Sequence, residues 1–130
     1  MMAIMAKKRT SVEHDINIIN ALKELPNPIF DKKHGWEIYF NDVKSRSNET
    51  RFEHIAKAYH QLKVRDIKLV AKGINNYVVF IKDNQLKDTY SYIIRRGGRD
   101  KGFIKLTILV DINNKTIAYV KSIYIVYRIK

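Results

Sequence analysis

The spacing of apolar residues changes between the first and second halves of the chain. From residue 10 to residue 74, apolar residues recur every three or four positions, which is typical of amphipathic helices. From residue 77 onwards they alternate with polar residues, as in strands that have one buried face. The pattern therefore predicts helices first and a sheet afterwards.

The first expected helix starts at Thr10. Thr10 and Glu13 have the spacing of a capping box, and Pro26 would end the helix that they open. Residues 1–9 before it are expected to be disordered. The apolar stripe of this helix would consist of Ile16, Ile19, Leu22 and Leu25.

Residues 36–43 leave two interpretations open. Trp36, Tyr39, Phe40 and Val43 have helical spacing, but the run WEIYF also fits a short strand. The polar run KSRSNE (44–49) that follows predicts an exposed loop.

Two further helices are expected before residue 75. Thr50 and Glu53 form a second capping box for a helix over 50–65, with an apolar stripe of Phe52, Ile55, Tyr59 and Leu62. Asp66 has the position of an N-cap for a shorter helix that ends at Gly73. The buried face of this helix would be Ile67, Val70, Ala71 and Ile74.

Four strands are expected at 77–82, 88–96, 102–112 and 115–129. Their connections are short, which implies antiparallel hairpins. In the third strand the even positions from Ile104 to Ile112 are aliphatic and should face the core, while Lys105 and Thr107 face the other side. In the last strand the odd positions are bulky, and the even ones are small or carry hydroxyl groups. We therefore predict one α+β domain (10–130), with helices on one face of a four-stranded antiparallel meander and an open, partly polar second face.

The net charge favours a polyanionic partner. The chain has 25 Lys and Arg against 13 Asp and Glu, a net charge of +12. Residues 66–130 hold thirteen of these cations and five of the anions, an excess of eight. Nucleic acid is the first expectation, and an anionic membrane or an acidic protein comes next. An ordinary basic domain rich in Lys and Ile is the alternative.

Several protein classes are disfavoured by what the sequence lacks. There is no cysteine, which excludes disulfides and Cys-ligated zinc. No apolar run reaches the roughly 18 residues that a membrane span needs, and MMAIMAKKRT does not have the order of a secretory signal. A cytoplasmic protein that does not bind membranes is the expectation.

The turn RRGGRDKG (95–102) crowds four cations around one anion, Asp100. Gly97 and Gly98 let the backbone turn or approach a ligand closely. Guanidinium groups match phosphate oxygens in pairs. The turn could equally be a solubilising hairpin tip. If it binds phosphate, the contacts would come from Arg95, Arg96, Arg99 and Lys101.

The helix expected at 50–65 contains two histidines. His54 and His60 are six positions apart, so they point to different sides and cannot form an i, i+4 metal pair. No other group of Asp, Glu and His has ligand spacing, so we expect neither a metal nor another cofactor. Either imidazole could serve as a general acid or base near neutral pH, or be an ordinary helix residue. At helical spacing, Arg51 and Arg65 lie on the same side as His54.

One family resemblance rests on the run RFEHIAKAYHQL (51–62) and on the strands that end in VKSIY (120–124). Together they resemble the small metal-independent nucleases that group barnase, EndoU, tRNase colicins and RelE, in particular the phage and mobile-element branch. The resemblance covers residues 50–129 and implies a barnase- or RelE-like fold. It leaves the N-terminal helices outside.

The resemblance also implies an activity and a set of site residues. His54 would be the general base, with His60 in reserve, and Arg95 or Lys105 would offset the charge on the phosphate. Ser122 with Tyr124 would supply the group from the last strand. The implied activity is an RNA endonuclease, a toxin or mobile-element effector that leaves a 2′,3′-cyclic phosphate and is inhibited by an acidic protein. The strands contain no second histidine to act as the acid.

Two hypotheses of different classes therefore stand. The first is this metal-independent RNA endonuclease. The second is a non-catalytic basic module that binds nucleic acid or an acidic protein. Under either, the residues expected to contact phosphate are Arg51, Arg65, Arg96, Arg99, Lys101 and Lys121.

Overall fold

A computed structural model provides the structure of the chain. It describes every residue except 1, 45–47, 59–60 and 129–130, and side chains are described from Val12 onwards. The described part contains the helices α1 (Met2–Glu24), α2 (Arg51–Ala58) and α3 (Val64–Gly73). Its strands are β1 (Ile29–Asp31), β2 (Trp36–Tyr39), β3 (Val79–Lys82), β4 (Thr89–Arg95), β5 (Phe103–Val110) and β6 (Ile117–Val126). The protein is thus an α+β protein, as its sequence predicts.

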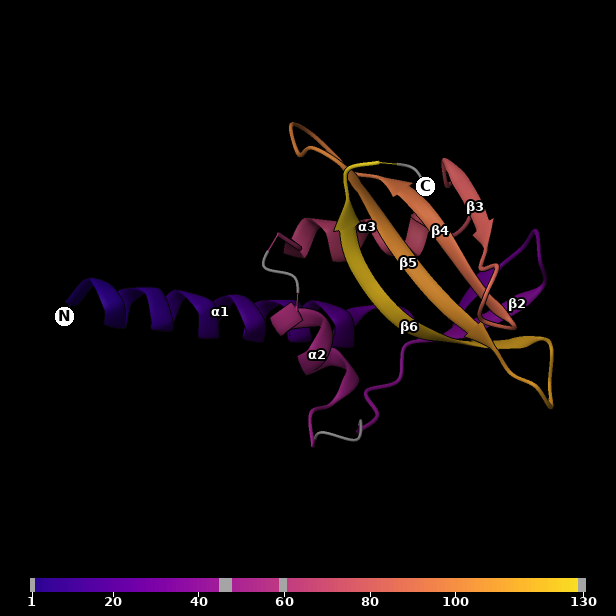
Figure 1. Cartoon of the computed structure of the whole chain (residues 1–130), viewed down its shortest axis with the longest axis horizontal. Coiled ribbons are helices and arrows are strands. Elements are labelled where there is room, and N and C mark those ends of the chain that lie inside the picture. Colours follow the sequence, from indigo (N-terminus) through magenta and orange to yellow (C-terminus); the bar gives the residue numbers. More distant parts are fainter. Residues whose placement is uncertain (1, 45–47, 59–60, 129–130) are drawn as a thin grey trace.

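The sheet has six strands in the order β1-β2-β6-β5-β4-β3 (Figure 1). The four strands β3 to β6 form the antiparallel meander that was expected. The hairpin of β1 and β2 adds to it, because β2 pairs in parallel with residues 117–119 of β6. The prediction of a purely antiparallel four-stranded sheet is therefore wrong, and the sheet is mixed.

Residues 36–39 form a strand and not the helix that one interpretation favoured. Ile38 and Phe40 are buried, whereas Val43 is 48% exposed. The burial therefore follows a period of two, and the helical spacing does not predict it. Parallel pairing with β6 also gives the backbone of β2 hydrogen-bond partners.

The sheet curls around the face that the helices cover. Two strands, β6 and β5, separate β2 from β4, yet the rings of Trp36 and Tyr90 lie 5.0 Å apart. The ring of His34 stacks on that of Phe80 in β3 at 4.2 Å. Contacts between strands so far apart in the sheet are possible only if its two edges bend towards each other.

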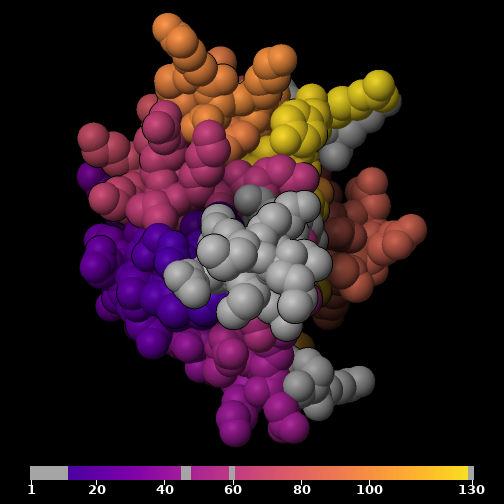
Figure 2. All heavy atoms as spheres, turned by 90° about the vertical axis from the view of Figure 1, so that its left-hand side faces the viewer, coloured from indigo at the N-terminus to yellow at the C-terminus, as the bar shows by residue number. Residues whose placement is uncertain are grey.

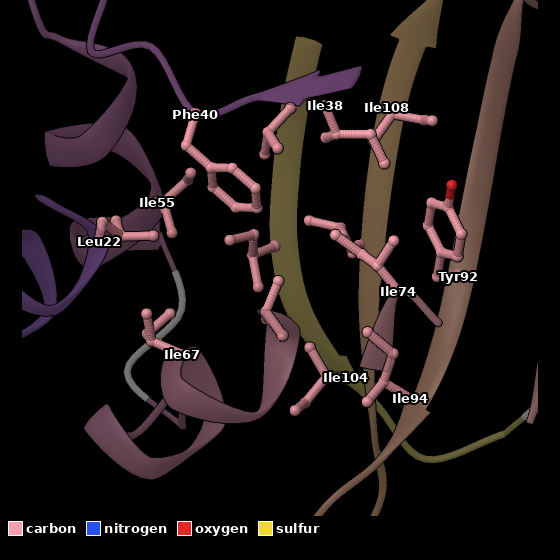
Figure 3. Close-up of a cluster of buried hydrophobic side chains, with 14 of the residues drawn as sticks. Leu22, Ile38, Phe40, Ile55, Ile67, Ile74, Tyr92, Ile94, Ile104 and Ile108 are labelled. Carbon is pink, nitrogen blue, oxygen red and sulfur yellow. The ribbon is translucent and has the colours of Figure 1, made fainter. Parts of the chain in front are cut away.

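The core lies between this curled face and the helices (Figure 3). The predicted core residues of β5 are buried from Ile104 to Val110, but Ile112 lies beyond the end of the strand and is 78% exposed. Gly73 lets α3 approach β4, because an added Cβ would lie 2.5 Å from the side chain of Ile94. The helices contribute Ile18, Leu22, Phe52, Ile55, Ile67 and Val70 to the core.

Helix boundaries differ from the expectation at three places. α1 begins at Met2, so Thr10 lies inside it, and the helix includes residues 2–9 that were expected to be disordered. α2 ends at Ala58, and the expected core residue Tyr59 lies outside the described residues. The N-cap of α3 is Lys63 and not Asp66. The predicted loop at 44–49 lies partly outside the described residues.

A β-bulge changes which residues of β6 share a face. Thr107 is opposite Ser122, but Ile108 is opposite Val120, so Lys121 is an extra residue in β6. Ala118 and Val120 face the core before the bulge, and Ile123 and Ile125 face it afterwards. Simple alternation predicted that the odd positions of this strand share one face. Because of the bulge, they do not.

Within the part of the chain that the structure describes, no helix combines the length and the apolar character needed to cross a bilayer.

Candidate nucleic-acid interface

The side of β5 and β6 that faces away from the helices, here called the open face, carries most of the predicted site. Lys105 is opposite Tyr124 in the sheet, and its Nζ lies 5.6 Å from the centre of the Tyr124 ring. This distance is within the range of a cation–π contact, about 6 Å. The aromatic ring thus holds an ammonium group over the middle of the open face.

Hydroxyl groups continue this arrangement along the same face. Ser122 is opposite Thr107, and Thr107 Oγ1 lies 2.8 Å from Ser91 Oγ in β4. Ser122 is half-buried, while Ser91 is almost completely buried. The structure therefore brings the predicted residues Lys105, Ser122 and Tyr124 together on adjacent strands.

Arg95 ends β4 on the same face. It is opposite Phe103, two positions before Lys105 on β5, and its side chain is exposed. Since partners that are directly opposite share a face, Arg95 extends the basic surface towards the β4–β5 turn.

His54 is not brought to these residues by any contact that the structure describes. Its side chain is 61% exposed, and its Nδ1 lies 3.1 Å from Glu49 Oε1. The buried residues of α2 belong to the core cluster, so α2 covers the face of the sheet opposite to Lys105; they are Phe52, Ile55 and Ala56. The resemblance implies that His54 acts as a general base beside Lys105, Ser122 and Tyr124, and the contacts of the described residues do not bring it there. His60 lies outside the described residues.

Arg96 is part of the fold rather than of the interface. Its Nε and Nη2 each donate to a carboxylate oxygen of Asp66 at 2.9 Å, and its Nη1 donates to the carbonyl of Lys101 at 2.6 Å. Asp66 is completely buried, and Arg96 is 9% exposed. The buried carboxylate of Asp66 and the carbonyl of Lys101 thus engage Arg96 within the fold, which argues against the predicted phosphate contact.

The β4–β5 turn lies against the start of α3, directly above it in Figure 2. The carboxylate of Asp100 is 2.6 Å from Lys63 Nζ and 3.5 Å from Arg65 Nη1. The hydrogen bond from Lys63, together with the nearby charge of Arg65, lowers the pKa of Asp100. The carboxylate of Asp100 thus balances part of the positive charge around the turn. Arg99 and Lys101 remain exposed there.

Arg51 lies at the outer edge of β6, just past the residues that pair with β2. Its Nη1 donates to the carbonyl groups of Val120 and Lys121, at 3.3 and 3.0 Å. These two carbonyl groups lie at the bulge, beyond residues 117–119, where β6 pairs with β2. Arg51 therefore provides a hydrogen-bond donor to backbone carbonyl groups at the edge of β6. Together with the exposed Lys121, it adds positive charge beside the open face.

Two features were not predicted from the sequence. One is a pocket beside Arg51, which the apolar Leu109 between the polar residues Thr107 and Asp111 of the same strand face could have indicated. The other is a buried polar cluster around Asp31, which accepts a hydrogen bond from the Tyr92 hydroxyl and lies 2.8 Å from His34 Nδ1. Backbone N–H groups of Lys33 and His34 also donate to Asp31, at 3.0 Å each. These partners link β1 to β4 and mark the cluster as structural.

His, Asp and Glu side chains in the described part of the chain do not gather into any group of three or more that could hold a metal. Comparisons with protein-family models, with curated proteins and with solved structures found no match for this chain.

Proposed function

We propose that the protein binds RNA through the phosphate backbone, on the open face of its sheet. One observation carries the proposal: Lys105 lies over the ring of Tyr124 and near Ser122, and all three side chains are partly exposed on the same face of the sheet. Ammonium groups attract phosphate, aromatic rings stack on bases, and hydroxyl groups can bind the ribose 2′-OH.

The charges on this face support an anionic partner. Within the described residues, neither Lys105 nor Lys121 forms an ion pair. Asp83 lies close enough to both lysines to be influenced by their charge, but its carboxylate already accepts backbone N–H groups of Gln85 and Leu86 at 2.8 Å each. The positive potential of the face is therefore available to a ligand.

Metal-independent RNA cleavage is the second candidate, and the grouping of Lys105, Ser122 and Tyr124 favours it. In this reaction the ribose 2′-oxygen attacks its own phosphate, loses its proton to a base, and forms a 2′,3′-cyclic phosphate. The bond to the 5′-oxygen breaks, and that oxygen takes up a proton. Lys105 would offset the charge on the phosphate, and Tyr124 or Ser122 would donate the proton. Among the contacts of the described residues, His54 pairs with Glu49 and reaches none of these three side chains, so binding without cleavage is the better supported function.

One experiment separates these outcomes. A labelled single-stranded RNA is incubated in EDTA with the wild type, with Lys105→Met and with Lys115→Met as the matched control. Lys115 is exposed in the β5–β6 turn, outside both strands. We expect the wild type to bind the RNA. Lys105→Met should weaken binding by about fivefold to tenfold, which corresponds to the loss of a charged contact of about 1–1.4 kcal/mol. Lys115→Met should leave binding unchanged.

The same samples report cleavage on a denaturing gel. Intact RNA supports binding alone. His54→Ala is added as a further sample, and cleavage by the wild type that is lost in this variant would establish the nuclease instead. Absence of RNA binding, or equal weakening by Lys105→Met and Lys115→Met, would contradict the proposed interface.

A further inference from the structure

A pocket opens at the end of the open face, where β2 stops pairing with β6. Its volume is about 290 Å³. This is near the lower end of the range for small-molecule sites, about 300–1,000 Å³. The residues that line it are Asn41, Val43, Arg51, Leu109, Tyr119, Val120 and Lys121. The size suits a single ring system rather than a folded partner.

The walls of the pocket are apolar and accessible. Val43, Leu109 and Tyr119 are 48%, 40% and 37% exposed, which is unusual for large apolar side chains that meet in one place. The Tyr119 hydroxyl donates to Asp111 at 3.2 Å, and its ring lies 6.2 Å from that of Tyr39. Tyr119 is therefore held in position and offers a stacking surface at little entropic cost.

Positive charge enters the same pocket. Arg51 and Lys121 line it, and none of its lining residues carries a carboxylate. The guanidinium of Arg51 is anchored through Nη1 to two carbonyl groups of β6, while its Nε and Nη2 donate to no group within the described residues. The fixed guanidinium thus retains donors for an anion.

We propose that this pocket binds one nucleotide of an RNA, with the base stacked on Tyr119 and the phosphate on Arg51 and Lys121. The inference rests on the proposed function and specifies its contacts. Asn41 is exposed at the pocket and carries both a donor and an acceptor, which can pair with the edge of a base. The pocket therefore gives an otherwise backbone-directed interface a preference for particular bases.

The test uses ligands that contain or lack a base. The full chain is titrated with the four 5′-ribonucleoside monophosphates, with ribose 5-phosphate and with inorganic phosphate, and amide NMR shifts are followed. We expect at least one nucleotide to bind about fivefold or more tightly than ribose 5-phosphate, because stacking contributes that much per base. Equal affinity for nucleotides and ribose 5-phosphate would overturn the inference.

Variants test the assignment to Tyr119. Tyr119→Ala should abolish the preference for nucleotides, while Tyr119→Phe, which keeps the ring, should retain it. Tyr127→Ala is the matched control, since Tyr127 is 60% exposed and does not line the pocket. If Tyr119→Ala does not fold, the wild-type comparison of nucleotides with ribose 5-phosphate still decides.

Failure of the inference can be told from failure of the proposed function. RNA binding that persists while nucleotides bind no better than ribose 5-phosphate would remove the base pocket and leave the interface. If neither RNA nor any nucleotide binds, both are contradicted.

Discussion

Arg96 and Asp66 form a two-pronged ion pair in which both hydrogen bonds measure 2.9 Å and the carboxylate is completely buried. The pair fastens the β4–β5 turn to the first turn of α3, because Asp66 also accepts the backbone N–H of Lys63 at 2.8 Å. One of the crowded cations of this turn thus serves the fold, and the surface that remains for a ligand is narrower than the sequence suggests.

Removing Arg96 should destabilise the protein strongly. Arg96→Met leaves Asp66 as an unpaired buried charge, and such losses cost about 3–5 kcal/mol. Chemical denaturation measures the free energy of unfolding. The double variant Arg96→Met with Asp66→Asn should recover part of this loss, because asparagine is neutral and still accepts from Lys63. A double variant no more stable than the single one would contradict this explanation.

The hydrogen bond of Lys63 to Asp100 predicts a dependence of stability on acid. The pKa of Asp100 is lowered below its ordinary value of 3.8, mainly because Lys63 donates to it. The stability that this pairing contributes is present above that value, and it is lost as the pH falls through the folded-state pKa. Wild type and Asp100→Asn should therefore differ in unfolding free energy at pH 7 and converge towards pH 2. A constant difference would show that the ionised carboxylate is not responsible.

The buried phenol of Tyr92 leads us to expect that the protein also loses stability at high pH. Burial, followed by its hydrogen bond to Asp31, raises the pKa of Tyr92 well above the ordinary 10. Above pH 10 the unfolded chain can ionise this phenol and the folded protein cannot, so the stability falls as the pH rises. Tyr92→Phe should cost about 1.5–3 kcal/mol near neutrality, because Asp31 loses a donor. The difference from wild type should shrink above pH 10, which denaturation at a series of pH values would reveal.

The meander was predictable because its information is local. Alternation in β5 placed Ile104 in the core and Lys105 on the open face, and short connections fixed the order of the strands. The place of β2 beside β6 was not predictable in this way, since a parallel pairing between residues 37–39 and 117–119 has no local signal. The bulge at Lys121, after which the residues of β6 that face the core change from even to odd positions, was missed for a related reason. A bulge depends on how the strand pairs with its partner, and the sequence of one strand does not show this.

The candidate site was predicted only in part. Residue type and alternation brought Lys105, Ser122 and Tyr124 to one face. The same reasoning could not show that Arg96 has a buried partner, because Asp66 lies thirty positions away along the chain. Nor could helical periodicity reveal which face of the sheet α2 covers, and therefore where His54 lies.

The capping box of α2 gives a prediction with a known magnitude. Thr50 Oγ1 accepts from the backbone N–H of Glu53 at 3.2 Å, and Glu53 accepts from that of Thr50 at 3.1 Å. Thr50→Ala should lower the free energy of unfolding by about 1 kcal/mol. Thr50→Ser, which keeps the hydroxyl, should lose much less. Equal losses in the two variants would show that the methyl group and not the cap is responsible.

The measurement that tests the central claim most directly is the salt dependence of RNA binding. For single strands, the slope of log K against log salt concentration is about −0.7 for each phosphate neutralised. Contacts from Lys105, Lys121 and Arg51 predict a slope of roughly −2, and Lys105→Met should reduce its magnitude by about 0.7. A slope near zero, or one that Lys105→Met leaves unchanged, would contradict the claim that the open face binds the phosphate backbone.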